Sequence, residues 1–324
     1  MVSSIVRLHP RLLSLSEFFA SLAGRAFTLR NPDGEQFWQL LSRLSPIAAR
    51  MFARGYTMRE LLYDFGPGAR FRPDNVPPII ATTLPHLTDD YEALYDELAP
   101  IVRAGCRAPL GDHYRFLFAW LCERFDRDLA VERSGSSLLL VPALARTFPE
   151  ARFVHLYRDG RDAAISMQRH NFFRLTASFA AFLTRCGLDP FRPPFIYGAS
   201  RLYAPIETAA FRLFPVETWL DRGVTVEAMG AYWSRLIESG VAFLAALPRE
   251  RVLHLCYEDI LVRPRAELAR FMSFLGREFE DAAWLERAST IPHPTGSRWR
   301  QLPAAQRETL TAACRPGLAL LGYA

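Results

Sequence analysis

The stretch HLYRDGRDAAISMQRH carries residue types that could bind a phosphate ester. Arg158 ends an apolar segment, FVHLY, that predicts a strand, and Ser166 lies eight residues later in a helical pattern. In parallel α/β proteins, ligands bind beyond the carboxyl ends of strands, where helix N-termini present unpaired amides. A guanidinium and a hydroxyl that converge there could hold a phosphate monoester. Alternatively, RDGRD is only an ion-paired helix cap, in which its two aspartates bond helix amides or Arg161.

The segments around this turn alternate between strand and helix patterns. Strands are expected at Leu129–Glu132, Arg152–Tyr157 and Arg251–Cys256. Helices are expected within 33–65, interrupted at Pro46, and at Tyr91–Ile101, Tyr114–Phe125, Leu138–Phe148, Val226–Leu247 and Arg265–Leu275. Residues 1–24 predict a helical fragment and a second segment after Pro10, and YEDILVRP predicts a turn.

This alternation with short connections is typical of a parallel α/β fold. A chain of 324 residues is long for one domain, but no linker interrupts it. We therefore expect a single α/β domain over residues 1–324, in which a parallel sheet is flanked by helices. The aromatic and proline-rich residues from about 171 to 222 predict a long insertion.

Arginine supplies all the positive charge of the side chains. The formal net charge is +5, and none of the 39 basic residues is a lysine. A Walker A loop, which requires GK[ST], is therefore excluded, and anions must be held by guanidinium forks and backbone amides. The excess charge is compatible with a solvated surface or an anionic ligand, and no arginine-aromatic run favours nucleic acid.

Cysteines and histidines give no metal or disulfide pattern. The cysteines lack CxxC spacing, and the histidines form no HExxH or HxH pair, so we expect reduced thiols and no metal site. No run of about 18 apolar residues predicts a membrane span. Polar residues such as Arg7 and His9 stand where a signal peptide needs an apolar stretch, so we expect a cytoplasmic protein.

Residues 131–167 resemble the sulfotransferase superfamily, whose sulfuryl donor is 3′-phosphoadenosine-5′-phosphosulfate (PAPS). In that family a strand ends in an arginine that binds the donor's 3′-phosphate together with a serine eight residues later. Arg158 and Ser166 match this pattern. Arg133 matches a basic residue near the phosphosulfate, at the end of the preceding strand. The resemblance implies a P-loop-like parallel sheet with helical insertions.

Two later blocks extend the resemblance. VLHLCYEDILVRPRAELARFMSFLG resembles the family's strand, YEDL turn and helix, and Tyr257 matches a tyrosine near the adenine. TGSRWRQLP resembles the C-terminal loop that closes over the nucleotide, where Arg298 and Trp299 match.

The family's glycine-rich loop for the 5′-phosphosulfate has no counterpart at the expected place. The N-terminal residues resemble the family's helix and acidic segment after that loop, so we expect the sequence to start inside or just after it, without the first strand. Alternatively, the SGSS turn at residues 134–137 took over this role.

The resemblance leaves the catalytic base with two interpretations. A histidine that many members place two residues after the basic residue is Gly135 here, whereas SLSEFF resembles bacterial members in which the glutamate is the base. Glu17 matches that glutamate. Equally, Glu17 could belong to a capping box with Ser14 or Ser16.

The implied activity is transfer of a sulfuryl group from PAPS to a hydroxyl or amine of a small-molecule, glycan or lipid acceptor. Arg133 would be the cation at the sulfate and Glu17 the proton acceptor, with no metal. The N-terminal part and the 171–222 insertion would shape the acceptor pocket. An inactive, truncated nucleotide-binding remnant is the alternative; a kinase-like phosphotransferase is disfavoured by the absence of lysine.

Overall fold

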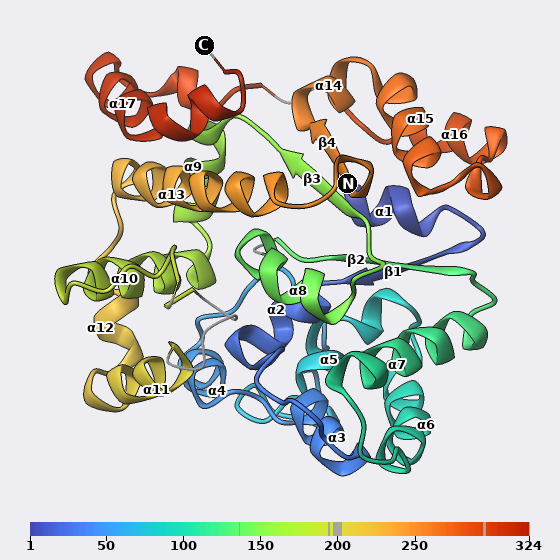
Figure 1. Cartoon of the computed structure of the whole chain (residues 1–324). Coiled ribbons are helices and arrows are strands. Elements are labelled where there is room, and N and C mark those ends of the chain that lie inside the picture. Colours follow the sequence, from blue (N-terminus) through green and yellow to red (C-terminus); the bar gives the residue numbers. More distant parts are fainter. Residues whose placement is uncertain (136, 194, 197–202, 294–295, 324) are drawn as a thin grey trace. The chain divides into compact units, whose positions relative to one another are not determined.

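The computed structural model describes residues 1–135, 137–193, 195–196, 203–293 and 296–323, which form two compact units (Figure 1). Residues 2–148 and 203–216 make up what we call the N-terminal unit. Residues 149–196 and 217–323 make up the C-terminal unit. The expectation of one domain over 1–324 stays a prediction.

The N-terminal unit is built around one pair of parallel strands. Strand β1 (Leu12–Ser16) pairs with β2 (Leu129–Arg133) in a register that places Ser16 opposite Arg133. The surrounding helices are α1 (Val2–Arg7), α2 (Phe18–Leu22), η1 (Ala23–Arg25), α3 (Gly34–Ser42), α4 (Pro46–Ala53), α5 (Pro78–Thr82), η2 (Leu84–His86), α6 (Tyr91–Arg103), α7 (Leu110–Arg124), η3 (Ser137–Leu140), α8 (Val141–Thr147) and α11 (Tyr203–Leu213). Because all five side chains of β1 are buried, this strand lies in the core of the unit.

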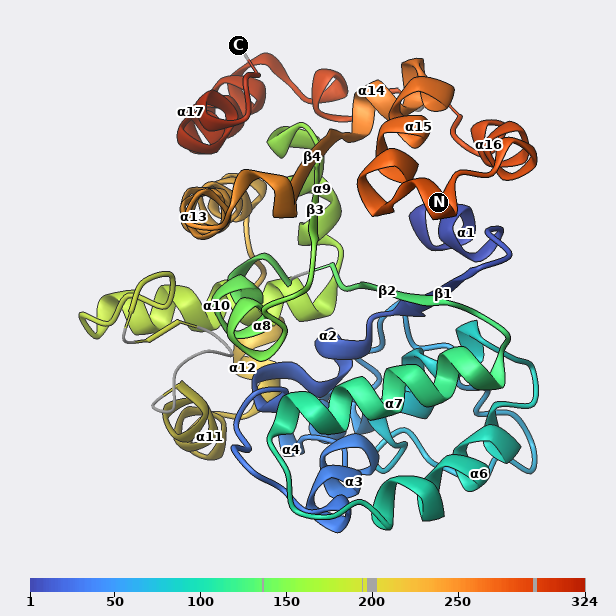
Figure 2. The same cartoon turned by 45° about the vertical axis from the view of Figure 1, so that its right-hand side comes forward.

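An aromatic cluster joins α2 to α7. Figure 2 shows helix α7 along its length. Phe18 and Phe19 are almost fully buried, and both rings contact Tyr114 and Phe118 edge to face. Such contacts add to the free energy gained by burying the rings. The residues that come after β1 are therefore fixed firmly in the core.

The C-terminal unit contains the second pair of parallel strands. Strand β3 (Phe153–Tyr157) pairs with β4 (Val252–Cys256), and Tyr157 lies opposite Cys256. The helices are α9 (Gly160–Gln168), α10 (Asn171–Arg185), α12 (Val216–Leu220), α13 (Val226–Ala245), η4 (Arg249–Arg251), α14 (Tyr257–Val262), α15 (Pro264–Leu275), η5 (Arg277–Phe279), α16 (Ala282–Ser289), η6 (Trp299–Gln301) and α17 (Ala304–Leu320). Helix α13 packs against α9 and α17 (Figure 1).

The mixed α/β class with parallel strands is confirmed, and the expected strands at 129, 152 and 251 are found to within one residue. The described residues form two two-stranded sheets, so the finer expectation of one P-loop-like sheet stays a prediction. None of the described helices has the length and apolar character needed to cross a membrane.

The structure gives the second N-terminal segment its conformation, and two local expectations were wrong. The second N-terminal segment begins with strand β1, because LLSLS pairs with a strand more than 100 residues away, which local periodicity does not report. The helical pattern of 33–65 ends at Ala53, where Gly55 takes a positive φ of 79°. The YEDILVRP turn is helix α14, whose first turn carries acidic residues that suit a helix N-terminus.

Candidate functional site

The carboxyl ends of β1 and β2 bring Glu17 and Arg133 together. Arg133 Nη1 donates to Glu17 Oε1 at 2.8 Å, and the Glu17 amide donates to the Arg133 carbonyl at 2.7 Å. The rest of the guanidinium donates to hydroxyls, with Nε to Ser3 at 2.6 Å and Nη2 to Ser16 at 2.5 Å. These two predicted site residues, 116 positions apart, therefore form one ion-paired centre.

Glu17 has a backbone conformation that non-glycine residues seldom adopt. Its φ and ψ are 55° and 26°, in the left-handed region. This conformation costs about 1 to 2 kcal/mol for an L-residue and persists only when its surroundings impose it. Here the burial of Phe18 and Phe19 fixes the following chain, while Arg133 holds the carboxylate on the other side.

Burial and charge act on the Glu17 carboxylate in opposite directions. The side chain is 10% exposed, and this burial raises its pKa, which the neighbouring Arg133 guanidinium partly offsets. A raised pKa brings a carboxylate closer to the range useful for accepting a proton. The capping-box interpretation was wrong, because Glu17 occupies the N-cap position of α2 without making a side-chain capping bond.

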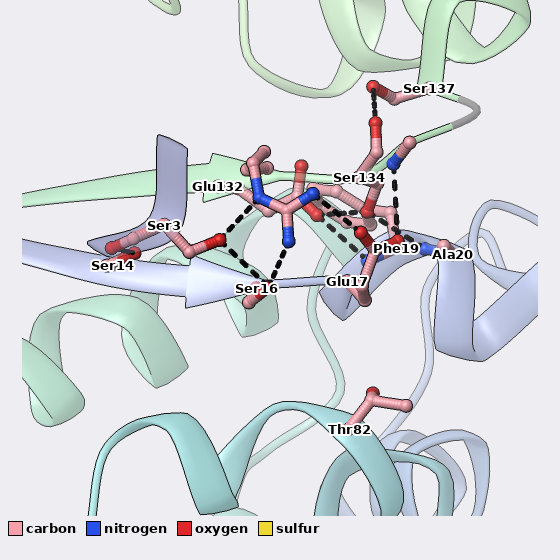
Figure 3. A network of polar contacts seen from close by, with 12 residues as sticks. Ser3, Ser14, Ser16, Glu17, Phe19, Ala20, Thr82, Glu132, Ser134 and Ser137 are labelled. Carbon is pink, nitrogen blue, oxygen red and sulfur yellow. Dashed lines mark hydrogen bonds and ion pairs between the residues drawn. The ribbon is translucent and has the colours of Figure 1, made fainter. Parts of the chain in front are cut away.

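Two residues that sequence reasoning missed supply the cap instead. Glu132 Oε1 accepts a hydrogen bond from the Phe19 amide at 3.2 Å, and Ser134 Oγ accepts one from the Ala20 amide at 3.1 Å (Figure 3). The Ser134 hydroxyl also donates to Glu132. Arg133 was chosen because it lies at the end of a strand. Its neighbour Glu132 lies there too, so the same sequence pattern could have indicated a role for Glu132.

Two residues of the SGSS turn are engaged with protein groups. The Gly135 amide donates to Glu17 Oε2 at 3.2 Å, and the Ser134 hydroxyl donates to Glu132. Ser136 lies outside the described residues. The alternative in which this turn cradles the 5′-phosphosulfate stays a prediction.

In the C-terminal unit, the side chains of Arg158 and Ser166 lie along one face of helix α9. Arg158 follows β3 and its Nη2 donates to the Asp162 carbonyl at 2.8 Å, which draws the guanidinium over the first turn of the helix. Ser166 is four residues beyond Asp162, hence on the same helix face, and it is exposed. A half-buried guanidinium and an exposed hydroxyl on one face suit a phosphate ester.

Asp162 also anchors the predicted C-terminal loop. Its carboxylate accepts hydrogen bonds from the Arg298 amide at 2.8 Å, the Trp299 amide at 3.0 Å and the Ser297 hydroxyl at 3.0 Å. The backbone that carries Arg298 and Trp299 is thereby tied to the helix that carries Ser166. Sequence reasoning gave Asp162 only a capping or ion-pairing role.

The ring of Trp299 contacts the guanidinium of a buried arginine. The Arg161 guanidinium lies 3.8 Å from the centre of the Trp299 ring and pairs with Asp159 at 2.7 Å. Asp159 also accepts a hydrogen bond from the Arg161 amide, as an N-cap of α9. The ion-paired cap that RDGRD suggested is thus present for these two residues, beside the Arg158 contact rather than instead of it.

Tyr257 lies at the same end of the strand pair as Arg158. Tyr157 and Cys256 are paired at the ends of β3 and β4. Arg158 and Tyr257 are therefore the residues that directly follow these two strands. Tyr257 is the first residue of α14 and is half-buried. Within the described residues, no three metal-ligating side chains gather closely enough to hold an ion.

Comparison with known proteins bears on this arrangement. Residues 67–194 match the model of the Sulfotransferase family. The matched segment, which is less than half of the chain, includes Arg133, Arg158 and Ser166. The superfamily resemblance is therefore confirmed, whereas the roles of individual residues stay predictions.

The solved structures similar to this chain include sulfotransferases. One is the sulfotransferase domain from the curacin biosynthetic pathway (13% identity, 97% of this chain and 96% of that one, TM-score 0.40). Others are the sulfotransferase domain of the Synechococcus PCC 7002 olefin synthase (16%, 97% and 89%, 0.41) and the sulfotransferase STF9 from Mycobacterium avium (16%, 98% and 72%, 0.41). No curated protein matches this chain.

Proposed function

We propose that this chain is a sulfotransferase that uses PAPS as its donor and transfers the sulfuryl group to a hydroxyl or amine of an acceptor. The observation that carries the proposal is the convergence on Asp162. The Asp162 carbonyl accepts a hydrogen bond from Arg158, and Ser166 lies on the same helix face. The Asp162 carboxylate accepts hydrogen bonds from the Arg298 and Trp299 amides of the C-terminal loop.

The donor set around Asp162 fits a phosphate monoester. Arg158 has no other hydrogen-bond partner among the described residues, so the remainder of its planar fork suits two oxyanion oxygens. Ser166 adds a hydroxyl, and Arg298 has an exposed side chain on the fastened loop. We assign Arg158 and Ser166 to the 3′-phosphate, Arg298 to its closure, and Tyr257 and Trp299 to the nucleoside.

Glu17 and Arg133 are the groups that we assign to the transfer step. The acceptor oxygen or nitrogen forms a bond to sulfur while the bond from sulfur to the donor's phosphate oxygen breaks, and adenosine 3′,5′-bisphosphate leaves. Glu17 takes the proton that the acceptor loses. Arg133 stabilises negative charge on the sulfuryl oxygens, the kind of fixed electrostatic assistance that contributes most to such reactions.

An open groove in the N-terminal unit supports the expected acceptor region. It has a volume of about 740 Å³ and lies between residues 25–28 and helix α11. Its lining residues are Arg25, Thr28, Pro205, Thr208, Ala209, Arg212 and Leu213. Both segments were expected to shape the acceptor pocket, and we propose that part of a small-molecule, glycan or lipid acceptor lies here.

Calorimetry with adenosine 3′,5′-bisphosphate tests the donor site. We expect Arg158→Ala to weaken binding by about 2 to 3 kcal/mol, the scale of lost charge-assisted hydrogen bonds. Arg185→Ala, which removes an exposed arginine from the end of α10, is the matched control and should bind normally. Unchanged affinity in Arg158→Ala would remove this assignment.

A transfer assay separates an enzyme from the inactive remnant. Incubation with ³⁵S-labelled PAPS and a panel of phenols, sugars and hydroxylated lipids should give a labelled product that depends on Glu17. Bisphosphate binding without any transfer across the panel favours the remnant.

A further inference from the structure

We propose that Glu132 and Ser134 are positioning residues, which cap helix α2 from strand β2 and so leave the Glu17 carboxylate free to face Arg133. The inference rests on the proposed function of Glu17 as proton acceptor. It concerns how that carboxylate is held, and its test includes measurements that need neither donor nor acceptor.

Helix α2 lacks the usual cap from its own N-cap residue. The first amides of a helix have no intrahelical partner, and the N-cap side chain commonly accepts from one of them. Glu17 stands at that position, but its carboxylate accepts from Arg133 at 2.8 Å and from the Gly135 amide at 3.2 Å. Something else must satisfy the first-turn amides, which lead directly into the buried aromatic cluster.

The substitute cap comes from the neighbouring strand. The Phe19 amide donates to Glu132 Oε1 and the Ala20 amide donates to Ser134 Oγ, over 3.2 and 3.1 Å. Because the Ser134 hydroxyl donates to Glu132, the two caps hold each other in place. Figure 3 shows both side chains reaching from the end of β2 to the start of α2.

One short segment therefore holds both the Glu17 carboxylate and the first amides of helix α2. Among residues 132–135, two side chains cap α2, the Arg133 guanidinium pairs with Glu17, and the Gly135 amide bonds its second oxygen. Without the substitute cap, the Glu17 side chain would compete for the amides of α2 and turn away from Arg133. The strained backbone of Glu17 is consistent with a residue held for function.

The Glu132 carboxyl group is adapted to this role by its environment. Burial raises its pKa to about 7, and the nearby charge of Glu17 contributes in the same direction. A neutral Glu132 can still accept the Phe19 amide, and it spares Glu17 a second negative charge close by. Because a glutamine side chain imitates that neutral form, Glu132→Gln is the conservative variant.

The experiment compares Glu132→Gln, Glu132→Ala and Ser134→Ala with the control Glu123→Ala, which removes an exposed glutamate from the end of α7. NMR would follow hydrogen exchange at the Phe19 and Ala20 amides and the titration of the ¹³C-labelled Glu17 carboxyl. Steady-state assays would give kcat and KM for the wild type and each variant.

We expect Glu132→Ala and Ser134→Ala to speed exchange at their respective amides about tenfold and to shift the Glu17 titration, with Glu132→Gln close to wild type in exchange. We expect kcat of Glu132→Ala to fall about tenfold with little change in the KM for the donor. An unchanged Glu17 titration in both alanine variants would overturn the inference, even in an active enzyme. A shifted titration in a chain without transfer would sustain it while refuting the proposed activity.

Discussion

The Glu17 carboxylate is held between two opposing influences, burial that raises its pKa and the Arg133 guanidinium that lowers it. Neither would suffice alone, because a buried carboxylate without a counter-ion becomes neutral and an exposed one stays a weak base. The two influences partly offset each other, and the net effect is a raised pKa of the Glu17 carboxyl group. At this scale the chemistry depends on single contacts, and single substitutions test it.

Removal of the Arg133 guanidinium should leave the effect of burial on the Glu17 pKa without its main opposing charge. In Arg133→Met, Glu17 loses its counter-ion, so we expect its pKa to rise further and the pH dependence of kcat to move to higher pH. Urea unfolding above the raised pKa of Glu17 should show a loss of about 1 to 3 kcal/mol in stability, since a buried carboxylate is left unpaired. Arg133→Lys keeps the charge and serves as control; identical pH profiles in both variants would contradict this account.

The loop anchored by Asp162 gives a second test at this scale. Asp162→Ala removes the acceptor of three hydrogen bonds from residues 297–299, so we expect about tenfold weaker bisphosphate binding and faster proteolysis of that loop. Asp162→Asn retains an oxygen for the Arg298 and Trp299 amides and should restore most of both. Equal losses in the two variants would show that the charge of Asp162, rather than its hydrogen bonds, matters.

At the scale of the elements, register decides which side chains meet. The parallel pairing of β3 and β4 places His155 opposite His254, with the two Nδ1 atoms 3.2 Å apart. His155 is buried. Burial, reinforced by the charge of His254, lowers the pKa of His155 to about 4.

This pair should make the C-terminal unit sensitive to acid. The unfolded chain takes up a proton near pH 6.5, before the folded His155 does near 4, so stability falls as the pH drops through that window. The loss is at most about 3 kcal/mol by linkage. Urea unfolding at pH 7 and 4.5 should show a smaller difference in His155→Leu than in wild type, and an unaltered one in His293→Gln, where the histidine is exposed.

The packing of α9 on α13 gives another prediction at this scale. A Cβ at Gly160 would lie 2.2 Å from the Trp233 ring, so only glycine allows this approach. We expect Gly160→Ala to destabilise the protein by about 1 to 3 kcal/mol and to weaken bisphosphate binding through displacement of α9. Gly296→Ala, with open space around its Cβ position, should be neutral in thermal unfolding; matching effects would disprove the steric argument.

At the scale of the whole molecule, the assigned groups are divided between the two units. Glu17 and Arg133 belong to the N-terminal unit, and Arg158, Ser166 and the 297–299 loop to the C-terminal unit. The single domain that the sequence predicts for residues 1–324 stays a prediction. Cooperativity of unfolding reports on this directly.

Differential scanning calorimetry should show one transition that shifts as a whole with adenosine 3′,5′-bisphosphate. At about 100 times the dissociation constant, linkage adds about 2.7 kcal/mol to the state that binds. If the units unfold independently, only the transition of the C-terminal unit will move, and the single-domain expectation fails. Adenosine, which lacks both phosphates, is the control ligand.

The sequence by itself determined the features that depend on local spacing. Arg158 and Ser166 are eight residues apart across a strand end and a helix, and that spacing led to the prediction of a shared phosphate site. The parallel strands after residue 128 and the long helix α13 were predicted from the same kind of local periodicity. The resemblance to the sulfotransferase superfamily rested on these motifs as well, and residues 67–194 match the model of that family.

Only the tertiary structure decided which distant residues meet. The pairing of β1 with β2 converted an ambiguous apolar run into a strand and joined Glu17 to Arg133, and the same register brought Glu132 and Ser134 to the first amides of α2. Asp162 likewise acquired its partners from a loop 135 residues away. The physical reason is that side-chain periodicity encodes a segment's own conformation, whereas hydrogen-bond register and core packing between distant segments select its partners.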